Sequence, residues 1–90
     1  MAVFANRSYT YRRFVGVASQ LLCADGKARL HMALQNEGGP LFVKLGLGAS
    51  LGDYSYRIPS SGILEVEGWS GPVTAIRSSG SGWVACTETV

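Results

Sequence analysis

The sequence predicts an all-β fold, a small antiparallel β-sandwich or barrel of about seven strands with an extended N-terminal arm. Apolar and polar residues alternate with a period of two in several short segments, and no segment shows a helical period. Turns rich in Gly, Ser and Pro separate these segments by roughly 8–12 residues, a spacing typical of antiparallel sandwiches. The chain has 90 residues, which is enough for one domain with a modest core.

The first part of the chain divides into an arm and a lead-in. Residues 1–13 carry apolar anchors in a polar background and predict an extended docking arm, and residues 14–90 form the sandwich domain. Residues 13–18 predict a strand or an extended lead-in, and residues 19–24 a first core strand. The Asp25-Gly26 pair then predicts a tight turn.

A small α+β fold is the alternative for this region. It would place a helix over residues 15–22, which are apolar enough for either structure. The segment 14–24, directly after Arg12 and Arg13, resembles a short secretion signal, but Ser19 and Gln20 interrupt its apolar run. It is also far shorter than the roughly 20 apolar residues of a membrane span.

The alternation is clearest in the middle of the chain. In residues 29–35, Leu30, Met32 and Leu34 share one face, and Arg29, His31 and Ala33 share the other. A turn with two glycines and a proline follows at residues 36–40. Residues 41–45 alternate again, which points Leu41, Val43 and Leu45 inward and Phe42 and Lys44 outward.

The second half repeats short strands and turns after a loop at residues 46–53. In the strand 54–58, Tyr54, Tyr56 and Ile58 share a face. In the strand 63–67, Leu64 and Val66 point inward and Glu65 and Glu67 outward, as on a solvated edge or opposite an arginine. Turns at 59–62, 68–72 and 78–81 delimit these strands and two more, which span residues 73–77 and 82–89.

Charge is sparse and unevenly distributed. Charged residues make up 16% of the chain, against about 25% in an average domain, which favours a surface covered by neighbours. Arg7, Arg12 and Arg13 precede the first acidic residue, Asp25. This basic start can meet an acidic protein surface, be merely solvated, or meet phosphates. Because three arginines are too few to track a phosphate backbone, we do not expect nucleic acid as a partner.

The sequence contains no catalytic or metal-binding constellation that we recognise, and we expect neither an enzyme nor a cofactor. Its two cysteines, Cys23 and Cys86, are too few for a disulfide scaffold and predict small buried hydrophobes. One His and two distant Cys do not suggest a metal site. The Gly46-Leu47-Gly48 segment lacks the Gly-Lys-Ser/Thr that a phosphate loop requires.

Aromatic residues and the basic start are the candidate partner-binding residues. A large aromatic ring can fill a core, anchor an interface or stack on a sugar, and Trp69 is open to all three interpretations. Alternation points Trp83 away from Val84 and Cys86. The candidate set is Phe4, Arg7, Tyr9, Tyr11, Arg12, Arg13, Phe42, Trp69 and Trp83.

The order of motifs from Arg29 onwards resembles small accessory proteins of tailed-bacteriophage virions. The matching features are Gln35-Asn36, Leu41–Ser50, Tyr54–Ile58, Gly62–Val66, Gly71–Ile76 and Thr87-Glu88. Such proteins include head decoration or cement proteins and proteins joined to the tail or its fibres. The Arg-rich start is less typical of them.

The resemblance implies a non-enzymatic virion protein that is assembled in the host cytoplasm. A capsid decoration or cement protein is the first expectation. Its partner would be the major capsid protein or another virion protein, and it would be a homo-oligomer on the particle, away from membranes. The alternative is a tail- or fibre-associated module that recognises a host-surface glycan or anchors a fibre. The pattern does not decide between head and tail.

Overall fold

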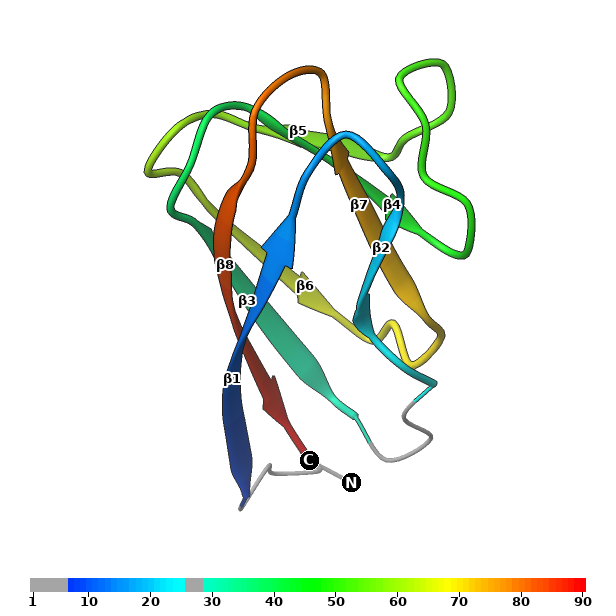
Figure 1. Cartoon of the computed structure of the whole chain (residues 1–90). Coiled ribbons are helices and arrows are strands. Elements are labelled where there is room, and N and C mark those ends of the chain that lie inside the picture. The colour runs from blue at the N-terminus through cyan, green and yellow to red at the C-terminus, as the bar shows by residue number, and fades with distance from the viewer. Residues whose placement is uncertain (1–6, 26–28) are drawn as a thin grey trace.

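The computed structural model describes residues 7–25 and 29–90, and these residues form an all-β sandwich (Figure 1). It has eight strands and no helix in the described parts of the chain. Two antiparallel four-stranded sheets face one another, sheet A with the order β1-β8-β3-β6 and sheet B with the order β2-β7-β4-β5. The strands are β1 Ser8–Val15, β2 Gln20–Cys23, β3 His31–Asn36, β4 Leu41–Leu45, β5 Tyr56–Ile58, β6 Ile63–Glu67, β7 Val73–Arg77 and β8 Gly82–Thr89.

The strand order is that of a jelly roll. The chain is doubled into one long antiparallel ribbon in which β1 pairs with β8, β2 with β7, β3 with β6 and β4 with β5. The ribbon is then wrapped so that β3 also pairs with β8 and β4 with β7. Eight strands in two such sheets define the double Greek-key arrangement of jelly rolls, which encloses a small core between the sheets.

The core lies between the sheets and follows the expected alternation. Leu41 and Val43 are buried and Leu45 is partly buried, while Leu64 and Val66 pack against the same cluster from sheet A. The inward faces predicted for these two strands are therefore confirmed. The fully buried members of the core are Val15, Leu22, Cys23, Met32, Leu34, Leu41, Val43, Val73, Ala75, Val84 and Cys86.

Strand β2 contributes two adjacent buried residues because its register shifts. Leu21 pairs with Thr74 and Cys23 with Val73, so one residue between them is unpaired with β7. A bulge of this kind breaks the alternation of side chains. It lets both Leu22 and Cys23 face the core. The alternative helix over residues 15–22 does not form, because β1 ends at Val15 and β2 begins at Gln20.

Most of the predicted arm is a sheet strand. Residues 8–13 belong to β1, which pairs with β8 at every position from Ser8 to Val15, so the boundary expected after residue 13 does not exist. β1 lies at the edge of sheet A, where backbone pairing and long side chains hold it instead of a continuous apolar face. Its polar composition therefore looked like that of a loose arm. Phe4 and the rest of residues 1–6 lie outside the described residues.

Two other orientations differ from the expected ones. Arg29 lies before β3 and is buried, at 3% exposure, because its guanidinium is bound by carbonyl and carboxylate oxygens. Tyr54 precedes β5 and packs on Phe42 on the outer side of sheet B, instead of sharing a face with Ile58. The turn expected at Asp25-Gly26 lies partly outside the described residues.

A buried arginine joins the sheets at one end of the sandwich. Arg77 of β7 is 1% exposed, and its guanidinium donates to the carbonyls of Val15, Gly39 and Trp83 and to the side-chain oxygen of Asn36. No carboxylate pairs with it in the described chain, and burial lowers its pKa. These oxygens compensate the desolvation of the cation.

Candidate interaction surface

Sheet A carries an exposed aromatic pair on its outer face. Phe14 of β1 is paired in register with Trp83 of β8, and their ring centroids lie 5.1 Å apart at 70°. Both side chains are about half exposed, at 52% and 45%. The guanidinium carbon of Arg12 lies 5.3 Å from the centroid of a Trp83 ring, and Arg12 also forms an ion pair with Glu37. We call Arg12, Phe14 and Trp83 the sheet A patch.

The outward orientation of Trp83 was predicted from its alternation with Val84 and Cys86, and it is confirmed. Phe14 was not singled out, because its position was assigned to the lead-in of the sandwich. Its pairing with Trp83 depends on the β1–β8 register, which the sequence does not reveal. Tyr, Phe and Trp side chains that remain exposed beside an arginine are the residue types that anchor protein interfaces.

A matching aromatic pair lies on the outer face of sheet B. Phe42 of β4 points outward as expected and contacts Tyr54, with ring centroids 4.9 Å apart at 71°. Phe42 is only partly exposed, and Tyr54 is exposed. The two pairs have similar ring geometry but belong to different sheets, so they provide a matched comparison for binding experiments.

The remaining candidates on β1 divide between surface and core. Arg7 and Tyr9 are exposed at the start of the described chain. Tyr11 packs against the core, and Arg13 lies over its ring at 4.8 Å while donating to the carbonyl of Leu22. Tyr11 and Arg13 therefore span the two sheets. Only Arg12 of the three candidates at positions 11–13 joins the sheet A patch.

Trp69 has a structural position in the turn between β6 and β7. It is partly buried against the core, and its indole N–H donates to the carbonyl of Pro72 at 3.0 Å. Its own carbonyl accepts from Nε of Arg29 at 3.1 Å. These contacts support the core interpretation among the three that the sequence left open.

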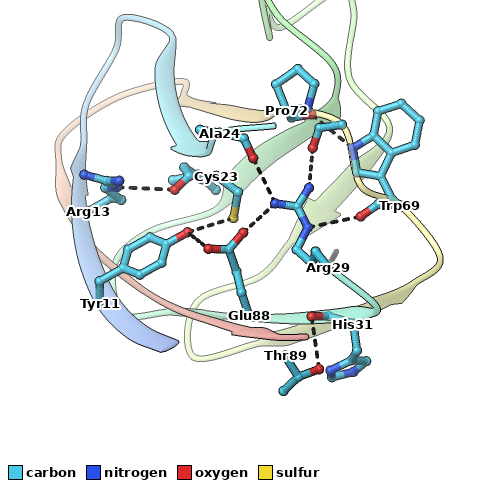
Figure 2. Close-up of polar contacts among 12 residues, drawn as sticks. Tyr11, Arg13, Cys23, Ala24, Arg29, His31, Trp69, Pro72, Glu88 and Thr89 are labelled. Carbon is cyan, nitrogen blue, oxygen red and sulfur yellow. Dashed lines mark hydrogen bonds and ion pairs between the residues drawn. The ribbon is translucent and has the colours of Figure 1, made fainter. Parts of the chain in front are cut away.

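A buried polar cluster surrounds Arg29 (Figure 2). Arg29 precedes the start of β3, whereas Arg77 binds Asn36 at the other end of that strand. Arg29 donates to the carbonyls of Ala24, Trp69 and Gly71, and it forms an ion pair with Glu88 at 2.5 Å. The side chain of Arg29 is 1% exposed and that of Glu88 is 20% exposed. Sequence patterns do not reveal this cluster, because its members are distant along the chain.

Tyr11 links this cluster to a thiol. Its hydroxyl lies 3.0 Å from Oε2 of Glu88 and 3.2 Å from Sγ of Cys23, so it can donate to only one of them at a time (Figure 2). Burial, together with hydrogen bonding to Cys23 and Glu88, raises the pKa of Tyr11. The hydroxyl thus stays protonated and serves as a donor inside the sandwich.

Cys23 and Cys86 face one another from the two sheets, and both are buried and free, as expected. Hydrogen bonding with Cys86 lowers the pKa of Cys23 to about 7 despite its burial. The same interaction and burial raise the pKa of Cys86. Cys23 therefore loses its proton more readily than Cys86 does. Both thiols are fully buried, so no substrate reaches them in the folded state.

The other sequence features remain separate from these thiols. His31 is on the outer side of β3, with Nε2 3.5 Å from Oε1 of Glu65, whereas both thiols face the core. Glu65 and Glu67 both point outward. Residues 7–25 and 29–90 contain no cluster of three or more His, Cys, Asp or Glu side chains suited to a metal ion. They also contain no helix long and apolar enough to span a membrane.

No family model, curated protein or solved structure matches the chain. The description of the chain therefore depends on its fold and its surface alone. The chain is a small all-β jelly roll with polar clusters at both ends of its core and exposed aromatic pairs on both outer faces.

Proposed function

We propose that the chain is a non-enzymatic structural protein of a tailed-phage virion, a decoration or cement protein that binds the assembled head. The observation that carries this proposal is the sheet A patch, in which Phe14 and Trp83 contact each other and remain about half exposed. Exposed aromatic side chains next to an arginine favour a protein partner. The motif order from Arg29 onwards supports the phage assignment.

The fold is compatible with this function. Jelly rolls occur in viral capsid proteins and also in lectins, so topology supports both a capsid role and a glycan-binding role without choosing between them. Buried arginines tie the two sheets together at both ends of the core through hydrogen bonds, which is compatible with a protein that bridges lattice subunits. A protein that binds only the assembled lattice stabilises it by mass action.

The tail-associated glycan module is the second candidate, and one detail favours the capsid role over it. Sugar stacking uses an open face of an aromatic ring. Arg12 lies over Trp83, and the edge-to-face contact with Phe14 further restricts access to the indole. A protein surface with a carboxylate can engage this arrangement more readily than a sugar ring can.

The test is attachment to phage heads. Purified chain is mixed with heads that lack it, and the bound fraction is measured after sedimentation for Trp83→Ala and for the matched control Tyr54→Ala. We expect Trp83→Ala to lose attachment while Tyr54→Ala keeps it, since only Trp83 belongs to the sheet A patch. If neither the parent chain nor Tyr54→Ala attaches to heads, the capsid role is wrong. If the parent chain then also binds glycan saturably, the glycan role replaces it.

A further inference from the structure

The two edges of sheet A are unpaired in the described chain. β1 pairs only with β8, and β6 pairs only with β3, so each has one side on which no described strand lies. An edge strand presents backbone N–H and C=O groups that can pair with another strand. β1 is long, with 8 residues, and in β6 neither Pro nor a bulge blocks pairing.

The directions of the strands allow copies of the chain to continue one sheet. All pairings in sheet A are antiparallel, so strand direction alternates from β1 through β8 and β3 to β6. β6 consequently runs opposite to β1. A second copy in the same orientation can place its β1 beside β6 of the first copy and continue the alternation. The outer faces of sheet A in the two copies then lie on the same side.

The charges on the two edges are opposite. On the outer face, β1 carries Arg12, whose side chain is 55% exposed, and β6 carries Glu65, whose side chain is 68% exposed, and Glu67. Arg12 meets Glu37 through one nitrogen and retains further N–H donors. Glu65 contacts only the imidazole of His31, through one oxygen at 3.5 Å. The guanidinium of Arg12 and the carboxylate of Glu65 can therefore each form an additional ion pair.

We propose that the chain binds a second copy of itself head to tail, with β1 of one copy adding to β6 of the next and extending sheet A. In the antiparallel register that best matches both edges, Arg12 lies opposite Glu65 and Thr10 opposite Glu67. The same register places Phe14, which is 52% exposed, opposite Ile63, which is 65% exposed. This register therefore pairs a cation with an anion at 12/65, two apolar side chains at 14/63, and a hydroxyl with a carboxylate at 10/67.

The two-fold alternatives bring like charges together. Pairing β1 with β1 places the arginines at positions 12 and 13 near their own copies, and pairing β6 with β6 does the same for Glu65 and Glu67. Like charges directly opposite one another destabilise a sheet. Head-to-tail contacts are heterologous, so the assembly closes into a ring or grows as a filament, depending on its rotation per copy.

This contact goes beyond the proposed function, because it joins free copies and does not require a virion. Attachment to heads is tested at Trp83 on β8, whereas self-association is tested separately at positions 65 and 67 on β6, which lie outside the sheet A patch. Loss of one activity without the other is therefore distinguishable.

Cysteine cross-linking tests the order and register of the strands. Thr10→Cys and Glu67→Cys variants are purified separately and oxidised with oxidised glutathione, alone and as a mixture. We expect disulfide-linked dimers only in the mixture. In the proposed contact, position 10 of one copy faces position 67 of the next, and neither position faces its own equivalent. The native thiols are buried and should not interfere. Dimers formed by a single variant would indicate two-fold pairing, and no dimers in the mixture would also overturn the proposal.

Charge reversal tests the ionic match in solution. Sedimentation of the parent chain over a range of concentrations should show association that Arg12→Glu or Glu65→Arg weakens about tenfold. The double variant should regain association, because the pair is restored with its signs exchanged. Arg57→Glu on β5 of sheet B is the matched control and should associate like the parent. A monomeric parent at every concentration, or single reversals without effect, would contradict the proposal.

Discussion

Arg77 of β7 donates to the side-chain oxygen of Asn36 of β3 at 2.9 Å, and this bond joins two buried polar side chains from opposite sheets. Asn36 in turn donates through its amide nitrogen to the carbonyls of Gly39, Ile58 and Pro59. The two side chains thereby hold the loops at this end of the sandwich. Stability should depend strongly on both.

Removing the guanidinium should destabilise the protein. In Arg77→Met, the side-chain oxygen of Asn36 and the carbonyls of Val15 and Gly39 lose a buried donor. We expect a loss of about 3 kcal/mol in the free energy of unfolding, measured with urea. An unchanged midpoint would show that water or another group replaces these bonds without cost.

Gly38 offers a sharper test of the same site, because it leaves the hydrogen-bonding groups in place. A Cβ at Gly38 would lie 2.9 Å from Cζ of Arg77, whereas one at Gly39 would meet nothing within 4 Å. We expect Gly38→Ala to cost about 1–3 kcal/mol and Gly39→Ala to cost much less. Equal effects of the two substitutions in urea unfolding would contradict the close approach of Gly38 to the guanidinium.

The opposite end of the core depends on the pairing of Arg29 with Glu88. Glu88→Ala leaves Arg29 buried without its carboxylate, and we expect a loss of about 3–5 kcal/mol. Glu37→Ala breaks the exposed pair with Arg12 and should cost less than about 1 kcal/mol. Thermal unfolding of both variants checks this contrast. A small effect of Glu88→Ala would mean that the three carbonyls around Arg29 are sufficient.

Stability should pass through a maximum as pH rises. The pKa of Cys23 is lowered in the fold to about 7 from 9.0, so between these values the unfolded chain binds more protons and stability rises with pH. The pKa values of Cys86 and Tyr11 are raised, so the unfolded chain loses these protons first, and stability falls as pH rises through and above their ordinary values of 9.0 and 10.0.

Urea unfolding between pH 6 and pH 11 measures this profile. Cys86→Ala should remove the rise, because Cys23 loses the thiol that lowers its pKa. Tyr11→Phe should reduce the fall at the alkaline end. A profile that is identical in the parent and both variants would exclude the coupling between these groups.

Deletion of residues 1–13 should unfold the domain, although the sequence predicted a separable arm there. It removes most of β1 and its antiparallel pairing with β8. Circular dichroism should show loss of cooperative unfolding. Deletion of residues 1–6 leaves all described strand pairs intact and is the appropriate control. A folded domain after the longer deletion would show that β1 is dispensable.

The sequence predicted the local elements better than their assembly. Alternation identified the inward faces of β4 and β6 and the outward orientation of Trp83, because a half-buried strand has a period of two. It missed β1, whose edge position permits polar residues. It also misplaced Arg29, because nothing local indicates that a cation will be buried by distant carbonyls.

The candidate surface was predicted only in part. Trp83 and Arg12 belong to the sheet A patch, but Phe14 joins them through the pairing of β1 with β8, which is a long-range relationship. Likewise, the opposite charges of the two edges of sheet A appear only when the order β1-β8-β3-β6 is known. Periodicity gives the face of a residue, whereas strand order gives its neighbours.

The copy number of the chain in purified virions is the decisive measurement for the proposed decoration role. Quantitative mass spectrometry of phage particles, calibrated against the major capsid protein, measures it. We expect many copies per particle, in a fixed ratio to the major capsid protein, because a decoration protein covers the head lattice. Absence of the chain from purified particles would contradict the proposed function.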